Sequence, residues 1–150
     1  MIAVLQRVTE GSVHVDGEQI SEIGHGLVIL LGVLDVDDVK DSSFLVEKIS
    51  GFRIFNDDKG KMNLSIKDVS GEILVISQFT LCGDWLKGRR PSFIRAASPQ
   101  KGNALYLDFI NKLRENNIHV RTGEFGAAMN VRLVNDGPVT FVLDSKKRKG

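Results

Sequence analysis

The chain has 150 residues, of which 42% are hydrophobic and 26% are charged, as expected of one soluble domain with a substantial core. A net charge of +1 gives no overall attraction for nucleic acid, and DNA is not an expected partner. No apolar run approaches the ~20 residues of a membrane helix, and the first residues lack a signal-peptide pattern, so we expect neither a membrane partner nor secretion. One cysteine, Cys82, excludes an internal disulfide and fits a reducing, cytoplasmic setting.

Turn signals and periodicity predict mostly strands in the first half of the chain. Asp16-Gly17 is a strong hairpin signal between alternating apolar and polar residues. The run 27–33 is apolar and too short for a typical helix, which favours a buried strand. The expected elements are a strand at 2–8, a hairpin at 12–23, a strand at 27–33, a helix at 38–50 and a short strand at 52–55.

The second half contains the clearest helix, at 99–116, in which Leu105, Phe109 and Leu113 recur at helical spacing. An irregular segment at 82–99 precedes it, and loops of that length are often functional. Strands are expected at 72–79, 118–121, 129–134 and 139–143. About eight strands and two main helices, mostly segregated, predict a single-domain α+β fold with a largely antiparallel sheet.

Few segments offer chemistry. The chain has no phosphate loop, no dinucleotide fingerprint and no paired-cysteine zinc site, and its three histidines are scattered, so no metal or cofactor is expected. Cys82 has no visible histidine partner and is expected to be a packed or loop thiol. No strand-turn-helix Gly-x-Ser-x-Gly element supports a serine triad.

Two polar segments remain. Ser77-Gln78-Phe79-Thr80-Leu81 ends an apolar strand, and its polar side chains indicate either a strand emerging into solvent or a polar-lined pocket. Asn135-Asp136-Gly137-Pro138-Val139-Thr140 is either an ordinary turn or a cis Gly-Pro turn that fixes where the Gly137 carbonyl points.

Together the two segments resemble the paired motif of the D-aminoacyl-tRNA deacylases. The likeness spans nearly the whole chain, and several segments in order at the family spacing make it specific. It includes residues 5–8, 12–17, 26–33, 53–55, 61–65 and 87–93.

The resemblance implies a deacylase-type fold, with a barrel-like mixed sheet in residues 1–145. Residues 146–150 form a basic tail, and such a run of charges predicts a disordered end. The resemblance further implies a homodimeric cytoplasmic hydrolase. Such an enzyme cleaves the ester between a D-amino acid and the 3′-terminal adenosine of tRNA, and removes glycine mischarged onto alanine tRNA.

The resemblance also assigns site residues. Gly137 and Pro138, followed by Thr140, form a cis chiral selector that enters the partner subunit's site, where L-residues are rejected. The remaining assignments are Ser77, Gln78, Phe79 and Thr80 for the catalytic pocket, Arg7 for bracing the selector, Met129 for contact with the terminal adenine, and Lys87, Arg89 and Arg90 for tRNA phosphates. We favour an attacking water assisted by the substrate's 2′-hydroxyl over Thr80 as a nucleophile.

The chain departs from the family pattern at Cys82, at residues 83–86 and at Asn130, beside the expected site. Two other functions stay open. One is a non-catalytic module or editing-type domain that binds the tRNA 3′ end, and the other is an esterase of small metabolites. The intact Gly-Pro motif favours the editing hydrolase.

Overall fold

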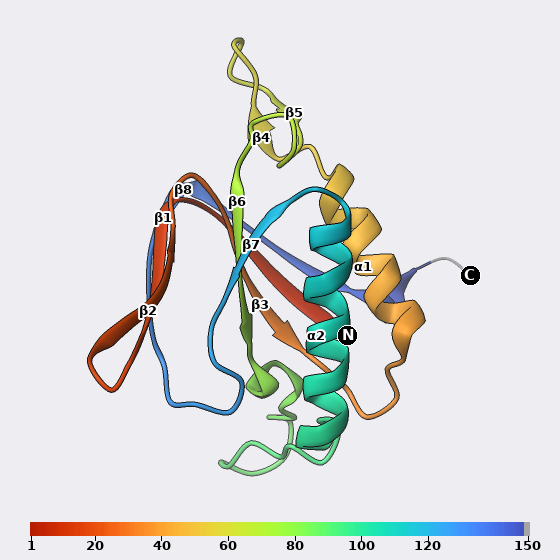
Figure 1. The fold of residues 1–150 in the computed structure, drawn as a ribbon. Coiled ribbons are helices and arrows are strands. Elements are labelled where there is room, and N and C mark those ends of the chain that lie inside the picture. Colours follow the sequence, from red (N-terminus) through yellow and green to blue (C-terminus); the bar gives the residue numbers. More distant parts are fainter. Residues whose placement is uncertain (149–150) are drawn as a thin grey trace.

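The computed structural model describes residues 1–148 and confirms the α+β class (Figure 1). The strands are β1 Ile2–Val15, β2 Glu18–Ile23, β3 Gly26–Gly32, β4 Phe55–Asn56, β5 Met62–Leu64, β6 Glu72–Ser77, β7 His119–Thr122 and β8 Asn130–Asp144. The α-helices are α1 Val39–Gly51 and α2 Pro99–Glu115, and the short 3₁₀ turns are η1 Phe79–Cys82 and η2 Ser145–Lys147.

The main sheet is mixed and nearly closes on itself. Its order is β2-β1-β3-β6-β7, and β8 pairs with β1. β1 is antiparallel to β2, β3 and β8, whereas β3, β6 and β7 run parallel to one another. Ser21 on β2 donates a hydrogen bond to the Thr122 carbonyl at the end of β7, which brings the two ends of the sheet together.

The helices lie in the two connections between the parallel strands. Figure 1 shows α1 and α2 side by side on one face of the sheet. Asp38 caps α1 by accepting from the Lys40 N–H, and Ser98 caps α2 directly before Pro99. Two parallel crossovers that each carry a helix are a feature that the segregated sequence pattern did not predict.

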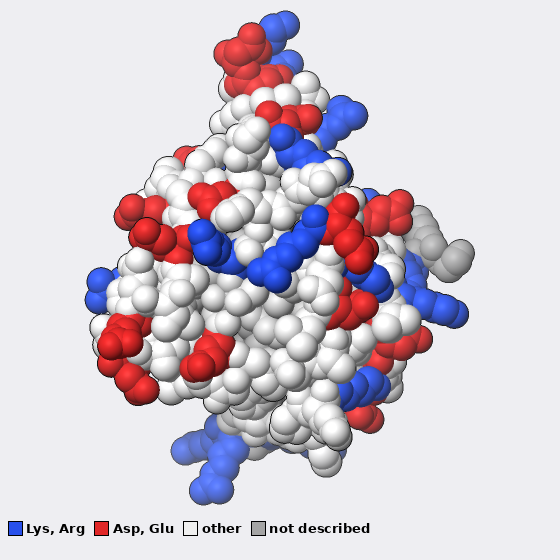
Figure 2. Space-filling view, viewed as in Figure 1, with Lys and Arg blue, Asp and Glu red and all other residues white. Residues whose placement is uncertain are grey.

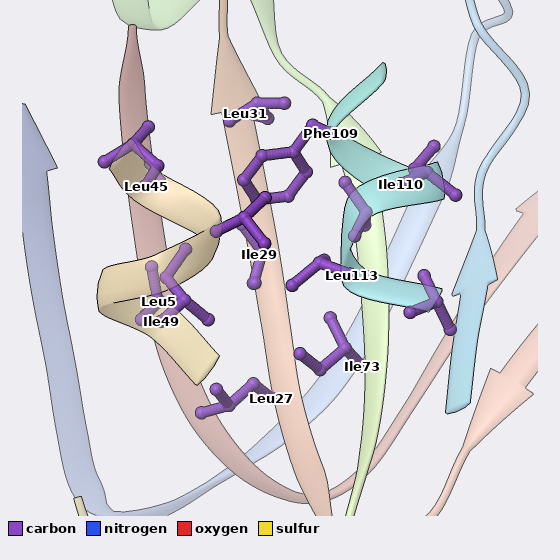
Figure 3. Close-up of a cluster of buried hydrophobic side chains, with 14 of the residues drawn as sticks. Leu5, Leu27, Ile29, Leu31, Leu45, Ile49, Ile73, Phe109, Ile110 and Leu113 are labelled. Atoms are coloured by element: carbon purple, nitrogen blue, oxygen red, sulfur yellow. The ribbon is translucent and has the colours of Figure 1, made fainter. Parts of the chain in front are cut away.

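The core fills the space between the helices and the sheet (Figure 3). Leu45 of α1 and Phe109 of α2 are fully buried against Leu5, Ile29 and Ile73 of the strands. The helical spacing that predicted an apolar stripe in α2 therefore marks the face that contacts the sheet. Within residues 1–148, no helix has the length and apolarity needed to span a membrane.

Several boundaries differ from those expected. β1 and β8 are each one long strand, where the sequence predicted separate segments, because β8 pairs with β1 along almost its whole length. Register shifts interrupt this pairing near Val8, so an irregularity in the ladder absorbs the turn residues of β8. β6 ends at Ser77, and Phe79 begins a 3₁₀ turn instead of continuing the strand.

The prediction of a disordered tail is wrong for the part of it that the structure describes. Lys146 belongs to η2, and both Lys146 and Arg148 form ion pairs with the buried carboxylate of Asp41. Asp37 accepts from the Met1 ammonium group within the same buried cluster. Residues 149–150 of the expected tail lie outside the described residues.

This cluster predicts that stability falls in acid. Burial acts to raise the pKa of Asp41, but hydrogen bonds from Ser145, from the Asp38 N–H and from Lys146 outweigh it and hold the pKa well below its usual value. A carboxyl group with a lowered native pKa stabilises the fold fully above its unfolded pKa of about 4, and that contribution is lost as the pH falls toward the native pKa.

We therefore expect Asp41→Asn to lower the free energy of unfolding at pH 7 by about 3 kcal/mol, and to flatten its decline between about pH 5 and pH 2. Urea unfolding across this pH range measures both effects. Asp57→Asn is the control, because Asp57 is partly exposed in a surface loop and accepts only local hydrogen bonds. Equal pH dependence in wild type and Asp41→Asn would contradict the prediction.

Candidate functional site

A pocket of about 560 Å³ lies where β6 ends, beside the start of α2. Ser77, Gln78 and Phe79 form one wall, and Ser98 and Pro99 at the N-terminus of α2 form another. Figure 1 shows η1 and the start of α2 meeting at the lower end of the molecule. The polar residues at the end of β6 therefore line a pocket, in agreement with the second of the two interpretations of the sequence.

The remaining lining is apolar or small. Its members are Val33, Ile76, Phe93, Ala96, Ala97, Gly102, Phe125, Gly126, Ala127, Met129 and Val131. Aromatic walls and a few fixed polar groups are typical of a site for a small ligand. None of the described residues that line this pocket carries an ionisable side chain, so the pocket itself supplies no side-chain general acid or base.

The polar groups of the pocket are backbone and side-chain dipoles. The Gln78 amide donates a short hydrogen bond to Thr80 Oγ1, which holds the two side chains together. Phe79 and Thr80 are the first residues of η1, and N–H groups in the first turn of a helix have no acceptor within it. These groups and the N-terminus of α2 can stabilise negative charge that develops on a bound carbonyl oxygen.

The Gly137-Pro138 turn forms a second, separate feature on β8. The peptide bond is cis, as the family resemblance implies, and Gly137 has a φ of 145°, a conformation that L-residues rarely adopt. Asn135 closes the turn: its side chain accepts from the Val139 N–H at 2.7 Å, and it donates to the Val139 carbonyl and to Thr140 Oγ1. Asn135 begins the predicted turn segment but had no assigned role there, although asparagine often bonds the backbone of its own turn.

Arg7 donates a hydrogen bond that holds the Gly137-Pro138 turn in place. Its guanidinium group is buried, and its Nε donates to the Asp136 carbonyl at 3.0 Å, directly before Gly137. The same group donates to the Ile54 carbonyl at 2.8 Å and to Asn56 Oδ1 at 3.2 Å. Arg7 therefore ties the turn to the segment around β4, and its role in bracing a selector stays a prediction.

The turn and the pocket of one chain lie far apart. Val131 lines the pocket, and Gly137 follows six residues later on the same strand, which corresponds to roughly 20 Å of extended chain. Gly137 and Pro138 are exposed and line no part of the pocket. The described chain thus brings Ser77, Gln78, Phe79 and Met129 together in one place, with Thr80 beside them, and Arg7, Gly137, Pro138 and Thr140 together in another.

The basic residues form a third group. Lys87, Arg89 and Arg90 are exposed on the loop that leads from η1 to α2. Phe93, from the end of this loop, and Phe125, from the loop after β7, both line the pocket, and neither was singled out from the sequence. Their contribution depends on how separate loops meet, which no local pattern indicates.

Other groups take no part in the pocket. The Cys82 thiol is buried and donates to the Val33 carbonyl, and burial raises its pKa, so it is a poor nucleophile. Within residues 1–148, no cluster of three or more His, Cys, Asp or Glu side chains could hold a metal ion. A larger hollow of about 710 Å³ between β1, β2 and β8 is lined by none of the predicted site residues.

Comparison with known proteins agrees with the whole-chain resemblance. The family described as D-Tyr-tRNA(Tyr) deacylase matches residues 4–144. A D-aminoacyl-tRNA deacylase of Geobacter sulfurreducens is 55% identical over 99% of this chain and 97% of its own length. That of Thermotoga petrophila is 54% identical over 98% of this chain and 99% of its own length.

Two solved structures share the fold. One, named c-Myc DNA Unwinding Element Binding Protein, has a TM-score of 0.90 and 43% identity over 96% of this chain and 98% of its own. The other, described as a probable eukaryotic D-amino acid tRNA deacylase, has a TM-score of 0.81 and covers 95% of this chain and 97% of its own. At 20% identity, the second likeness concerns the fold alone.

Proposed function

Because this chain belongs to the D-Tyr-tRNA(Tyr) deacylase family, we propose that it hydrolyses the ester that joins a D-amino acid to the 3′-terminal adenosine of tRNA. The observation that carries the proposal is the pocket at the end of β6, which offers dipoles, aromatic walls and no ionisable side chain. Such a pocket suits an ester that is already activated and needs orientation and charge stabilisation. We expect the enzyme to act in the cytoplasm, where its substrate is made.

We propose that the site is completed by a second copy of the chain. Gly137 and Pro138 are exposed and lie too far along β8 to reach the pocket of their own subunit. Among the described strands, β8 pairs only with β1, so its other edge is open, and Val134 and Val142 on it are exposed. A long open edge with exposed valines favours pairing with another chain, and a two-fold dimer would place each turn at the partner's site.

In this arrangement the Gly137 carbonyl selects the substrate by shape. When fixed backbone groups hold the α-amino group and the ester carbonyl, a D-residue directs its Cα–H toward the selector. An L-residue must place its Cβ where the carbonyl lies and is excluded, whatever its side chain. Glycine has no Cβ, so the same geometry admits glycyl-tRNA(Ala) as a second substrate.

The chemical step that we favour is attack by water, assisted by the ribose 2′-hydroxyl of the terminal adenosine. The water oxygen bonds to the ester carbonyl carbon, and the N–H groups of Phe79 and Thr80 stabilise the oxyanion. The C–O bond to the 3′ oxygen then breaks, and that oxygen takes the proton that water gave up. Thr80 lies beside the site, and its Oγ1 accepts a hydrogen bond from Gln78.

Hydrolysis of D-tyrosyl-tRNA and L-tyrosyl-tRNA, measured in single turnover, tests the proposal. We expect rapid release of the D-amino acid and no measurable release of the L-amino acid above the uncatalysed rate. Thr80→Ala should lower the rate less than about tenfold, whereas a 2′-deoxy terminal adenosine should lower it about 100-fold.

Equal rates on the two enantiomers would disprove the proposed function. Binding of D-tyrosyl-tRNA without turnover would favour the non-catalytic module. Near-complete loss of hydrolysis in Thr80→Ala, with the 2′-deoxy substrate still cleaved, would instead identify Thr80 as the nucleophile.

A further inference from the structure

The loop of residues 84–95, between η1 and α2, exposes large apolar side chains to solvent. Trp85 is 77% exposed, Leu86 75% and Ile94 89%, whereas aromatic and branched aliphatic side chains are usually buried. A group of such side chains on one surface loop is typical of a binding surface.

The loop has a defined shape. Asp84 and Ser92 form a β-bridge in which each N–H donates to the other's carbonyl, at 2.8 and 2.9 Å. The Asp84 carboxylate also accepts from the Leu86 N–H at 3.0 Å, which turns the chain directly after Trp85. Trp85 is therefore presented at the base of a closed loop.

The charge of the loop is strongly positive. Lys87, Arg89, Arg90 and Arg95 lie within it, and Asp84 is its one acidic residue. Figure 2 shows basic side chains projecting from the lower end of the molecule, the end at which α2 begins in Figure 1. An exposed aromatic ring beside several cations is the combination that binds single-stranded nucleic acid, because bases stack on the ring and phosphates pair with the cations.

The loop continues into the wall of the pocket. Phe93 follows the bridge residue Ser92, lines the pocket and packs edge-on against Phe79 with ring centroids 5.0 Å apart. Trp85 follows Asp84, the partner of Ser92 in the same bridge. The bridge therefore connects the loop that presents Trp85 to the wall of the pocket, where a strand whose terminal nucleoside is bound can contact it.

We propose that Trp85 is a positioning residue that stacks on an unpaired base directly preceding the terminal adenosine of tRNA, while Lys87, Arg89 and Arg90 contact the adjoining phosphates. This inference rests on the proposed function. The positive charge favours a polyanion over a second copy of this chain, whose loop would carry the same charge.

Trp85 is the one tryptophan of the chain, so its fluorescence reports on this position alone. We expect uncharged tRNA with its CCA end to quench the emission, and the same tRNA without its last three nucleotides to leave it unchanged. In a filter-binding assay, Trp85→Ala should weaken the affinity for the intact tRNA about tenfold. Trp85→Phe should keep most of the wild-type affinity. In the hydrolysis assay, Trp85→Ala should raise KM with little change in kcat. Ile20→Ala removes an exposed apolar side chain from β2, outside the loop, and should change none of these quantities.

Equal quenching by the truncated tRNA, or unchanged binding by Trp85→Ala, would overturn the inference. If the Trp85 emission changes with protein concentration and does not change when RNA is added, the loop is a contact between copies of the chain. That result would also overturn the inference. These results do not depend on turnover: a protein that fails to hydrolyse D-tyrosyl-tRNA while the intact CCA end quenches Trp85 would refute the proposed activity and support the contact with the RNA end.

Discussion

Replacement of Gly137 by alanine is expected to lower the single-turnover rate on D-tyrosyl-tRNA about 100-fold, because displacing a positioning group by about 1 Å can cost that much. Gly137 has a φ of 145°, and an added Cβ would lie 2.9 Å from the Val139 nitrogen and 2.6 Å from Val139 Cγ2. The backbone must therefore move, and the carbonyl that we propose as the selector moves with it. We expect the preference for D over L substrate to narrow as well, since the exclusion of Cβ depends on that atom's position.

Gly60→Ala is the matched control for this change. Gly60 also has a positive φ, of 76°, but an added Cβ meets nothing within 4 Å, and the residue lies in the loop between β4 and β5. Both variants carry the cost of an unfavourable φ, about 1–2 kcal/mol, so both should lose some stability. Unchanged rates and selectivity in a folded Gly137→Ala protein would show that the Gly137 carbonyl is not the selector.

Local sequence patterns predicted most helices and strands of the fold. The features that they did not predict depend on pairing between segments far apart in the sequence. The helix at 99–116 and the hairpin at Asp16-Gly17 follow from spacing and turn chemistry that a single segment contains. The continuity of β8 does not, because it depends on pairing with β1 across more than a hundred residues of sequence. Pairing that distant leaves no signal in either segment alone.

Local sequence patterns also predicted only part of the candidate site. The polar end of β6 is visible in the sequence as Ser and Gln after an apolar run, and these residues do line a pocket. The contact between Arg7 and the Asp136 carbonyl joins opposite ends of the chain, and only the family resemblance pointed to it. The basic tail was misjudged for a similar reason: its partner, Asp41, lies more than a hundred residues away and is buried.

The absence of ionisable side chains among the described residues of the pocket makes its geometry decisive. An enzyme with a general base can tolerate less precise positioning of its substrate, since proton transfer supplies part of the rate enhancement. Here orientation and dipoles must supply most of it, so the groups that fix the turn and the pocket should matter as much as the groups that touch substrate. Arg7 is one of these supporting groups and makes three hydrogen bonds from a buried guanidinium group.

Arg7→Ala is accordingly expected to lower the free energy of unfolding by about 3–5 kcal/mol, because it leaves the Ile54 and Asp136 carbonyls without their donor. Arg7→Lys keeps the charge but replaces a planar group with several donors by a compact ammonium that cannot reach all of these acceptors. We expect Arg7→Lys to fold and yet to lose about tenfold in rate on D-tyrosyl-tRNA, since the turn before Gly137 loses its fixed support. Urea unfolding and single-turnover hydrolysis measure the two effects separately.

Asn56→Ala separates stability from positioning. It removes one acceptor of the Arg7 guanidinium but leaves the bond to the Asp136 carbonyl, so it should cost about 1 kcal/mol of stability with little change in rate. If Arg7→Lys and Asn56→Ala lose stability and retain wild-type rates alike, Arg7 supports the fold without positioning the turn. A rate loss confined to the Arg7 variants would instead tie the activity to the bond that fixes Asp136 directly before the selector.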